Sequence, residues 1–146
     1  IVMAFLELEK KEPKLNFEII FAGSISDKIL EEFELFPNFK YYGYVEHHKA
    51  VDLMCQANIL LNFLFNQNKK SSMISGKLIE YMATGNPILM IGDSKGEASR
   101  LLSKQSYNLT IEPTDIDSIT SFIKNKYDNW VNGTKHKAEY SPVLPF

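Results

Sequence analysis

Cysteine is almost absent from this chain, since Cys55 is the only one among 146 residues. A single cysteine forms no intrachain disulfide, and no Cys/His spacing fits a zinc site. Arginine is equally scarce, with Arg100 alone, and 16 basic side chains against 18 acidic ones leave a net charge of -2. This balance argues against a nucleic-acid-binding protein, which needs a basic surface that follows the phosphates. No apolar run reaches the roughly 18 residues that suggest a membrane span, and no signal-peptide pattern is present.

What is present has the composition of a globular domain. Hydrophobic residues make up 45% and charged residues 23% of the chain, and a mass of 16.8 kDa is that of one ordinary domain. The chain opens on Ile1 rather than methionine, and residues 1–8 already have the apolar spacing of a helix. We therefore expect it to be a piece of a longer protein.

Short β-branched or aromatic runs alternate with helical segments along the chain. Strands are predicted over 17–22, 39–45, 59–64, 87–91 and 109–111, and helices over 2–11, 27–36, 47–56, 76–84, about 94–104 and about 114–131. This alternation predicts an α/β fold with a mainly parallel sheet and helices on both faces. The third strand is apolar nearly throughout, which is typical of a strand covered on both faces.

Several local signals mark the ends and the buried faces of these helices. Ser26 is expected to cap the second helix, Ser94 and Glu97 have the spacing of a capping box, and Gly85 with Pro87 form a stop signal. The side chains expected to face the core are Ile29, Leu30, Phe33 and Phe36 of the second helix, and Val51, Met54 and Cys55 of the third.

In parallel α/β sheets, ligands bind beyond the carboxyl ends of the strands, and one segment there is the most informative. Lys77 and Glu80 share a face of the predicted helix 76–84, which begins at a polar loop after a buried strand. Free N–H groups and the dipole at a helix start favour a phosphate, to which Lys77 would add a positive charge. Glu80, one turn deeper, could accept hydrogen bonds from two vicinal hydroxyls. An exposed Lys77–Glu80 ion pair without ligand is the alternative. Lys69-Lys70 in the loop could approach a diphosphate or be solvated.

The stretch Gly76-Lys-Leu-Ile-Glu-Tyr-Met-Ala-Thr-Gly-Asn-Pro-Ile-Leu89 resembles a family signature. It is similar to that of the carboxyl-terminal domain of GT-B-fold glycosyltransferases, specifically the retaining family 4 (glycosyl transferases group 1). The order of the preceding segments, Phe21-Ala-Gly-Ser24, Tyr42-Gly-Tyr-Val45 and Ala57-Asn-Ile-Leu-Leu61, agrees, and the resemblance covers about residues 1–126. It implies a Rossmann-like three-layer α/β/α domain that forms one half of a GT-B fold and binds a nucleotide-diphosphate sugar.

The resemblance also implies roles for individual residues. Glu80 would hold the donor ribose and Lys77 would lie by the diphosphate, with Ser75, Gly76, Leu78 and Ile79 lining the pyrophosphate. The backbone around Tyr44 and Val45 would face the base. Gly23-Ser24 follows a predicted strand and could let the backbone approach a ligand, although a plain turn explains this pair equally well.

Two departures from the family pattern concern the completeness of the site. Family members often carry a second Glu eight positions before the ribose Glu, where this chain has Ser72. The first strand of such a domain should precede Ile1, and so should the separate acceptor-binding domain. We therefore expect residues 1–132 to be a donor-binding domain without its first strand, residues 133–146 to be a tail, and this chain alone to transfer no sugar.

Two other motifs have simpler explanations. His47-His48 are adjacent, so they point to different faces of a helix, and a solvated helix start is favoured over a catalytic or metal site. Asp115-Ile-Asp117 resembles the metal-binding Asp-x-Asp of another glycosyltransferase fold. Because a helix follows it directly, we interpret these acids as a cap and as partners of the helix dipole.

The resemblance thus implies the donor-binding domain of a bacterial hexosyltransferase in polysaccharide biosynthesis, with a glycan or lipid-linked saccharide as acceptor. The resemblance implies no cofactor, no metal and no nucleic-acid partner, and no catalytic residue is assigned. It implies a cytoplasmic enzyme, either free or peripherally associated with the inner face of the membrane. The alternatives are a non-catalytic Rossmann-like binding or interaction module and a nucleotide-sugar 2-epimerase-like domain.

Overall fold

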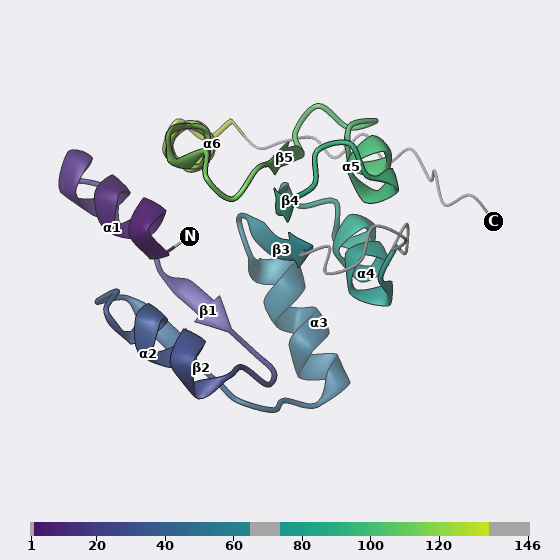
Figure 1. Cartoon of the computed structure of the whole chain (residues 1–146), viewed down its shortest axis with the longest axis horizontal. Helices are drawn as coiled ribbons and strands as arrows, with labels where there is room; N and C mark the ends of the chain where they lie inside the picture. Colours follow the sequence, from purple (N-terminus) through teal and green to yellow (C-terminus); the bar gives the residue numbers. More distant parts are fainter. Residues whose placement is uncertain (1, 65–73, 135–146) are drawn as a thin grey trace.

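The computed structural model describes residues 2–64 and 74–134 of the chain (Figure 1). In these ranges the helices are α1 (Val2–Lys11), α2 (Asp27–Glu34), α3 (His47–Gln56), α4 (Gly76–Thr84), α5 (Glu97–Leu102) and α6 (Ile116–Val131). The strands are β1 (Ile19–Phe21), β2 (Phe39–Tyr41), β3 (Leu60–Leu64), β4 (Ile88–Gly92) and β5 (Leu109–Ile111). Every pairing among these strands is parallel. Helices α1, α2 and α6 lie on one side of the strands and α3, α4 and α5 on the other (Figure 1), so the predicted α/β fold of Rossmann-like three-layer type is confirmed.

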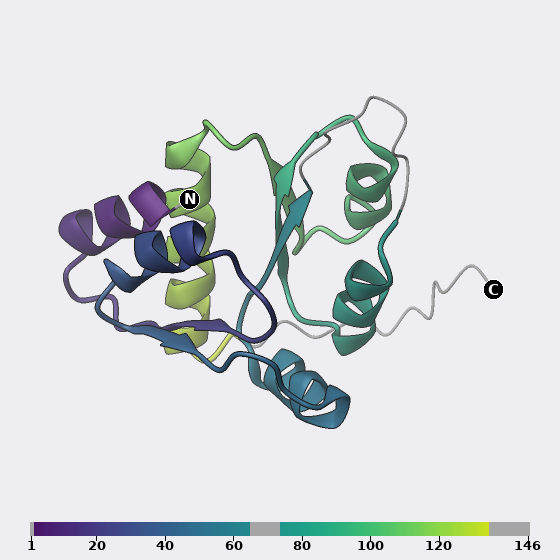
Figure 2. The same ribbon diagram turned by 60° about the horizontal axis from the view of Figure 1, so that its bottom comes forward.

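The strands belong to two hydrogen-bonded sheets rather than the single sheet expected. One has the order β1-β2 and the other β3-β4-β5, and β5 lies at an edge as predicted. In register, Ile19 lies opposite Phe39 and Leu60 opposite Ile88. Figure 2 shows β3, β4 and β5 between α6 on one side and α4 and α5 on the other.

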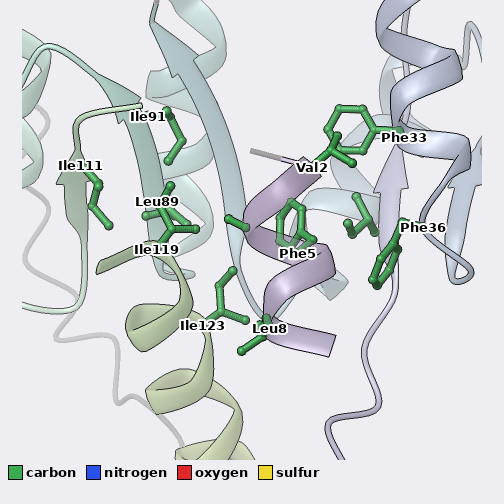
Figure 3. Packing of buried hydrophobic residues seen from close by; sticks show 12 residues of the cluster. Val2, Phe5, Leu8, Phe33, Phe36, Leu89, Ile91, Ile111, Ile119 and Ile123 are labelled. Carbon is green, nitrogen blue, oxygen red and sulfur yellow. The ribbon is translucent and has the colours of Figure 1, made fainter. Parts of the chain in front are cut away.

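The hydrophobic core is centred on β4. All five residues of β4 are buried, and their side chains alternate between two clusters on the two faces of the sheet. Leu89 and Ile91 join the cluster under α1, α2 and α6, which Figure 3 shows at close range, and Ile88 and Met90 join the one under α4 and α5. The strand buried on both faces is therefore β4, whereas β3, for which we predicted this, buries only Leu60 and Asn62. Within the described ranges, β4 is the one strand that is paired at both edges, and its side chains pack into a core cluster on each face of the sheet.

The helix boundaries follow the local signals in part. Helix α4 begins after Ser75, whose Oγ accepts from the Leu78 N–H at 3.3 Å, and ends at Gly85 with a φ of 72°. At α2, Ser26 occupies the N-cap position without a side-chain bond to the helix. The predicted capping box is wrong, because Gly96 is the N-cap of α5 and Ser94 binds elsewhere.

The predicted buried faces of α2 and α3 need correction. Phe33 and Phe36 are buried and stack on Phe39 and Phe17, but Ile29 is 45% exposed. Helix α2 packs on a sheet of only two strands. This small sheet buries the side chains near the carboxyl end of the helix and leaves those near its start exposed. Helix α3 has no fully buried residue, Val51 and Met54 are half-buried, and Cys55 is exposed.

A buried amide side chain holds β4 at its start. Asn108, 8% exposed, accepts a hydrogen bond from the Ile88 N–H at 2.9 Å and donates to Gln105 Oε1 at 3.1 Å. We expect Asn108→Ala to lower the free energy of unfolding by about 2 kcal/mol, because the Ile88 N–H would stay buried without an acceptor. Urea unfolding measures this, with Asn38→Ala at an exposed position as control. Equal stability of the two variants would contradict this role.

Candidate functional site

The first set of predicted site residues lies in the first turns of α4 and comprises Ser75, Gly76, Lys77 and Glu80, here called the α4 group. Ser75 Oγ and the Ser75 carbonyl both accept from the Leu78 N–H, at 3.3 and 3.0 Å. In the described part of the chain, no acceptor is bonded to the Gly76 or Lys77 N–H. A Cβ built on Gly76 would meet no atom within 4 Å. The start of α4 thus presents two backbone donors at an open surface, which is the geometry that favours an anion.

Lys77 and Glu80 do not form the ion pair that was the alternative to a ligand site. Both side chains are exposed. Lys77 Nζ instead lies 5.3 Å from the centroid of the Tyr81 ring, within reach of a cation–π interaction. Among residues 2–64 and 74–134, Glu80 makes no hydrogen bond and no ion pair. The lysine is therefore positioned by its aromatic neighbour, and the carboxylate is accessible to a ligand.

The second half of the signature has a structural role that sequence reasoning did not find. Thr84 Oγ1 donates to the Tyr81 carbonyl at 2.7 Å and accepts from the Asn86 N–H at 3.1 Å. Asn86 Nδ2 donates to the carbonyls of Met54 and Cys55, at 2.9 and 3.2 Å. These bonds end α4 and attach it to the last turn of α3. A Thr-Gly-Asn-Pro run after a helix is a local stop signal. The sequence does not predict that its asparagine binds the end of α3.

The second set of predicted residues follows β1 and β2. The Gly23 N–H donates to the Gly43 carbonyl at 2.7 Å, so the two turns are tied together. Gly23 has a φ of 122°, which side-chain-bearing residues rarely adopt. Ser24 is exposed, Val45 is half-buried, and Tyr44 is 88% exposed.

Both sets lie after the carboxyl ends of parallel strands, as predicted, but on different sheets. In the described ranges, no hydrogen bond, ion pair or ring contact joins Gly23, Ser24, Tyr44 or Val45 to the α4 group. The α4 group is therefore the better defined of the two.

A third feature at this edge of the fold links the loops after β4 and β5. Glu112 Oε1 accepts from the Ser94 N–H at 3.1 Å and from Ser94 Oγ at 2.9 Å. Sequence reasoning assigned Ser94 to a helix cap and gave Glu112 no role. This bond fixes the two loops relative to each other, and it occupies the one carboxylate at the end of β5.

The remaining candidates have local explanations. His48 Nδ1 lies 3.3 Å from Glu46 Oε2, with both side chains exposed. Asp115 accepts from the Ser118 N–H at 3.0 Å and from Ser118 Oγ at 2.6 Å, which confirms its interpretation as a helix cap. The hydroxyl of Ser118 first, and then its N–H, lower the pKa of Asp115. No group of three or more metal-ligating side chains occurs in the residues that the structure describes. Lys69, Lys70 and Ser72 lie outside these residues.

No protein-family model matches this chain, and no curated protein matches it significantly. None of the helices in residues 2–64 and 74–134 has the length and apolar character needed to cross a membrane. The basis for a functional proposal is therefore the fold and the geometry of the α4 group.

Proposed function

We propose that this chain is the donor-binding domain of a glycosyltransferase that moves a sugar from a nucleotide-diphosphate sugar to an acceptor. The observation that supports this most is the start of α4. Among the described residues, Lys77 and Glu80 are exposed there and form no ion pair, and two N–H donors beside them have no acceptor. A positive charge and backbone donors suit a diphosphate. A carboxylate one turn further along the helix suits the two hydroxyls of a ribose.

In the proposed reaction, the bond between the anomeric carbon of the sugar and the diphosphate oxygen breaks, and its electron pair leaves with the diphosphate. The oxygen of an acceptor hydroxyl bonds to that carbon and releases its proton to solvent. The diphosphate leaves with additional negative charge. The N–H groups of Gly76 and Lys77 and the Lys77 ammonium would stabilise this charge, and Glu80 would orient the nucleotide. The tie between Gly23 and Gly43 holds the backbone before Tyr44 and Val45, which would face the base.

The acceptor, a glycan or a lipid-linked saccharide, would be bound by another domain of the full-length enzyme, which we propose to work in the cytoplasm or at the inner face of the membrane. Catalysis needs both substrates to be oriented across a cleft between the domains. The chain alone should therefore bind a nucleotide without transferring sugar, and transfer by the purified chain would contradict this.

Calorimetric titration of the chain with a panel of nucleoside diphosphates tests the proposal. We expect dissociation constants on the order of 0.1–1 mM for the preferred base. The corresponding nucleosides are the control, and they should bind more weakly because they lack the phosphates. Absence of binding to every diphosphate would favour a non-catalytic interaction module.

Gly76→Ala should change stability and binding in opposite directions. Alanine in a helix is more stable than glycine by roughly 0.5–1 kcal/mol, and the structure leaves room for the added methyl group. The same methyl group stands where a phosphate would approach, and loss of one hydrogen bond to it corresponds to about 2–10-fold weaker diphosphate affinity. Melting temperature and titration measure both effects. Unchanged diphosphate affinity would place the phosphate elsewhere.

A further inference from the structure

We propose that a cavity between α5 and β5 is a second binding site of this chain, and that it takes a neutral ligand rich in hydroxyl groups, of the size of one sugar ring. The cavity has a volume of about 230 Å³. The described residues that line it include no member of the α4 group and none of the turns after β1 and β2. The inference is therefore independent of the proposed function.

Helix α5 and strand β5 form the walls of the cavity. Ser99 and Ser103 lie one turn apart and share a face of the helix, with Leu102 beside them. On the strand side, Thr110 lies opposite Met90, which belongs to the cluster under α4 and α5. Residues in register on neighbouring strands point to the same face, so the Thr110 side chain is directed toward α5. Figure 1 shows α5 on the side of the strands away from α6.

The observation that points to a ligand is a buried hydroxyl without a partner. Ser99 lines the cavity and is only 8% exposed. In residues 2–64 and 74–134, neither Ser99 Oγ nor Thr110 Oγ1 makes a hydrogen bond. Every described polar side-chain atom that is sealed from solvent has a partner, so Ser99 Oγ is reached through the cavity. A hydroxyl removed from bulk water needs a new hydrogen-bonding partner, and a polar ligand in the cavity would supply it.

The rim of the cavity adds hydrogen-bond acceptors. Ser103 Oγ donates to a backbone carbonyl of its own helix, and Ser94 Oγ donates to Glu112 Oε1, both at 2.9 Å. Each of these hydroxyls has committed its hydrogen and keeps lone pairs that can accept, whereas Ser99 and Thr110 can still donate. The cavity thus offers donors and acceptors together. This combination suits ligand hydroxyls, because each of them also donates and accepts.

Charge and size narrow the class of ligand. No charged side chain is among the described residues that line the cavity, so an ion bound there would lose its hydration without compensation. The Glu112 carboxylate, bonded to Ser94 at the rim, would also repel an anion. A volume of about 230 Å³ equals that of roughly seven or eight water molecules, which is room for one sugar ring or cyclic polyol and too little for a nucleotide. Leu102, 1% exposed, adds an apolar wall for the C–H face of such a ring.

Bound water alone is the alternative occupant. Several hydroxyls converge on the cavity, so it is polar enough to hold water rather than stay dry. A polyol would put its own hydroxyls where these waters bind and release the waters to solvent, which favours binding when their hydrogen bonds are reproduced. Saturable binding of a polyol at the cavity therefore separates the two occupants.

Amide NMR titration of the 146-residue chain with D-glucose, D-galactose, D-mannose and myo-inositol tests the proposal. We expect at least one probe to cause saturable shifts in α5 and β5, with a dissociation constant on the order of 1–10 mM, as for about twelve non-hydrogen atoms at ordinary ligand efficiency. D-glucuronate, the charged control, should bind more weakly. Absence of saturable shifts with all four probes would overturn the proposal, and so would shifts confined to the α4 group.

Two conservative variants test the hydroxyls themselves. Ser99→Ala and Thr110→Val each remove one hydroxyl and little volume, and each should weaken binding of the probe about 2–10-fold. Alanine also favours a helix, so Ser99→Ala should fold. Ser121→Ala, at an exposed position of α6, is the matched control and should leave the affinity unchanged. Equal affinities in all three variants would overturn the proposal, because the ligand would then not contact these hydroxyls.

Ser103→Leu tests the cavity by filling it from the rim. Ser103 is exposed, so the larger side chain is compatible with folding, which the melting temperature checks. We expect it to abolish measurable binding of the probe, and preserved binding would overturn the proposal. Ser99→Ala and Ser103→Leu should leave the affinity for nucleoside diphosphates unchanged. The second site and the proposed function can therefore fail separately.

Discussion

Replacing Glu80 by alanine should weaken the binding of a nucleoside diphosphate at least about tenfold. The carboxylate has no partner among the described residues, so a ribose diol would be its main hydrogen-bonding group. Each charge-assisted hydrogen bond is worth about 1.5–3 kcal/mol. Glu80→Gln should lose less, because one acceptor oxygen remains. Titration of both variants in the full-length protein measures the difference.

Lys77→Ala tests the phosphate side of the same site. It should weaken nucleoside diphosphate binding and scarcely change the affinity for the bare nucleoside, because the proposed partner is phosphate. Lys95→Ala, at an exposed lysine in another loop, is the matched control and should leave both affinities unchanged. The Tyr81 contact contributes little to stability at such an exposed position, about 0.5–1 kcal/mol.

Two outcomes of these titrations would contradict the proposed site. Unchanged diphosphate affinity in both alanine variants, with the melting temperature preserved, would exclude Glu80 and Lys77 from binding. Equal losses for the diphosphate and the nucleoside in Lys77→Ala would show that the lysine does not contact phosphate. Either result would leave the fold assignment intact.

Gly92→Ala should destabilise the fold by about 3 kcal/mol. Gly92 ends β4 beside Leu64 of β3, and a Cβ added there would lie 2.4 Å from the Leu64 carbonyl oxygen. Because that oxygen belongs to backbone held by the sheet, it cannot move aside without separating β3 from β4. Urea unfolding measures the loss as a lower midpoint, while the slope of the unfolding free energy against urea concentration should stay the same.

Gly96→Ala, in the loop that follows β4, is the matched control for Gly92. An added Cβ there would lie 3.5 Å from the Asp93 carbonyl oxygen, an ordinary contact, and the φ of -71° suits any residue. We expect a change within about 0.5 kcal/mol. Similar losses in both variants would show that the close approach at Gly92 does not determine stability.

Several elements follow from local sequence alone. The bounds of α1, α3, α4 and β5 are those predicted, and the stop at Gly85 comes from one residue that can adopt a positive φ. The predicted strands 17–22 and 39–45 shorten to Ile19–Phe21 and Phe39–Tyr41. Hydrophobic runs indicate where strands occur, but strand length depends on how far a neighbour pairs with them.

The candidate site was likewise predicted in part from local sequence and determined in part by the tertiary structure. The sequence placed Lys77 and Glu80 one turn apart on a helix that begins after a strand, because helical spacing and the Ser75 cap are local properties. Only the tertiary structure showed that Lys77 lies over Tyr81 rather than beside Glu80. Side-chain direction within a helix face is decided by packing, and spacing leaves both pairings open.

Long-range partners are what the sequence left undetermined. Asn86 binds the end of α3, Asn108 holds Ile88, and Ser94 binds Glu112. The division of the strands into two sheets also emerged only from the structure. By itself, the sequence determined the α/β class, the order of the elements and the helix that carries the candidate site, because periodicity and turn residues act over a few positions. The tertiary structure decided which distant groups satisfy each other, because buried polar groups take whichever partner the fold brings within hydrogen-bonding distance.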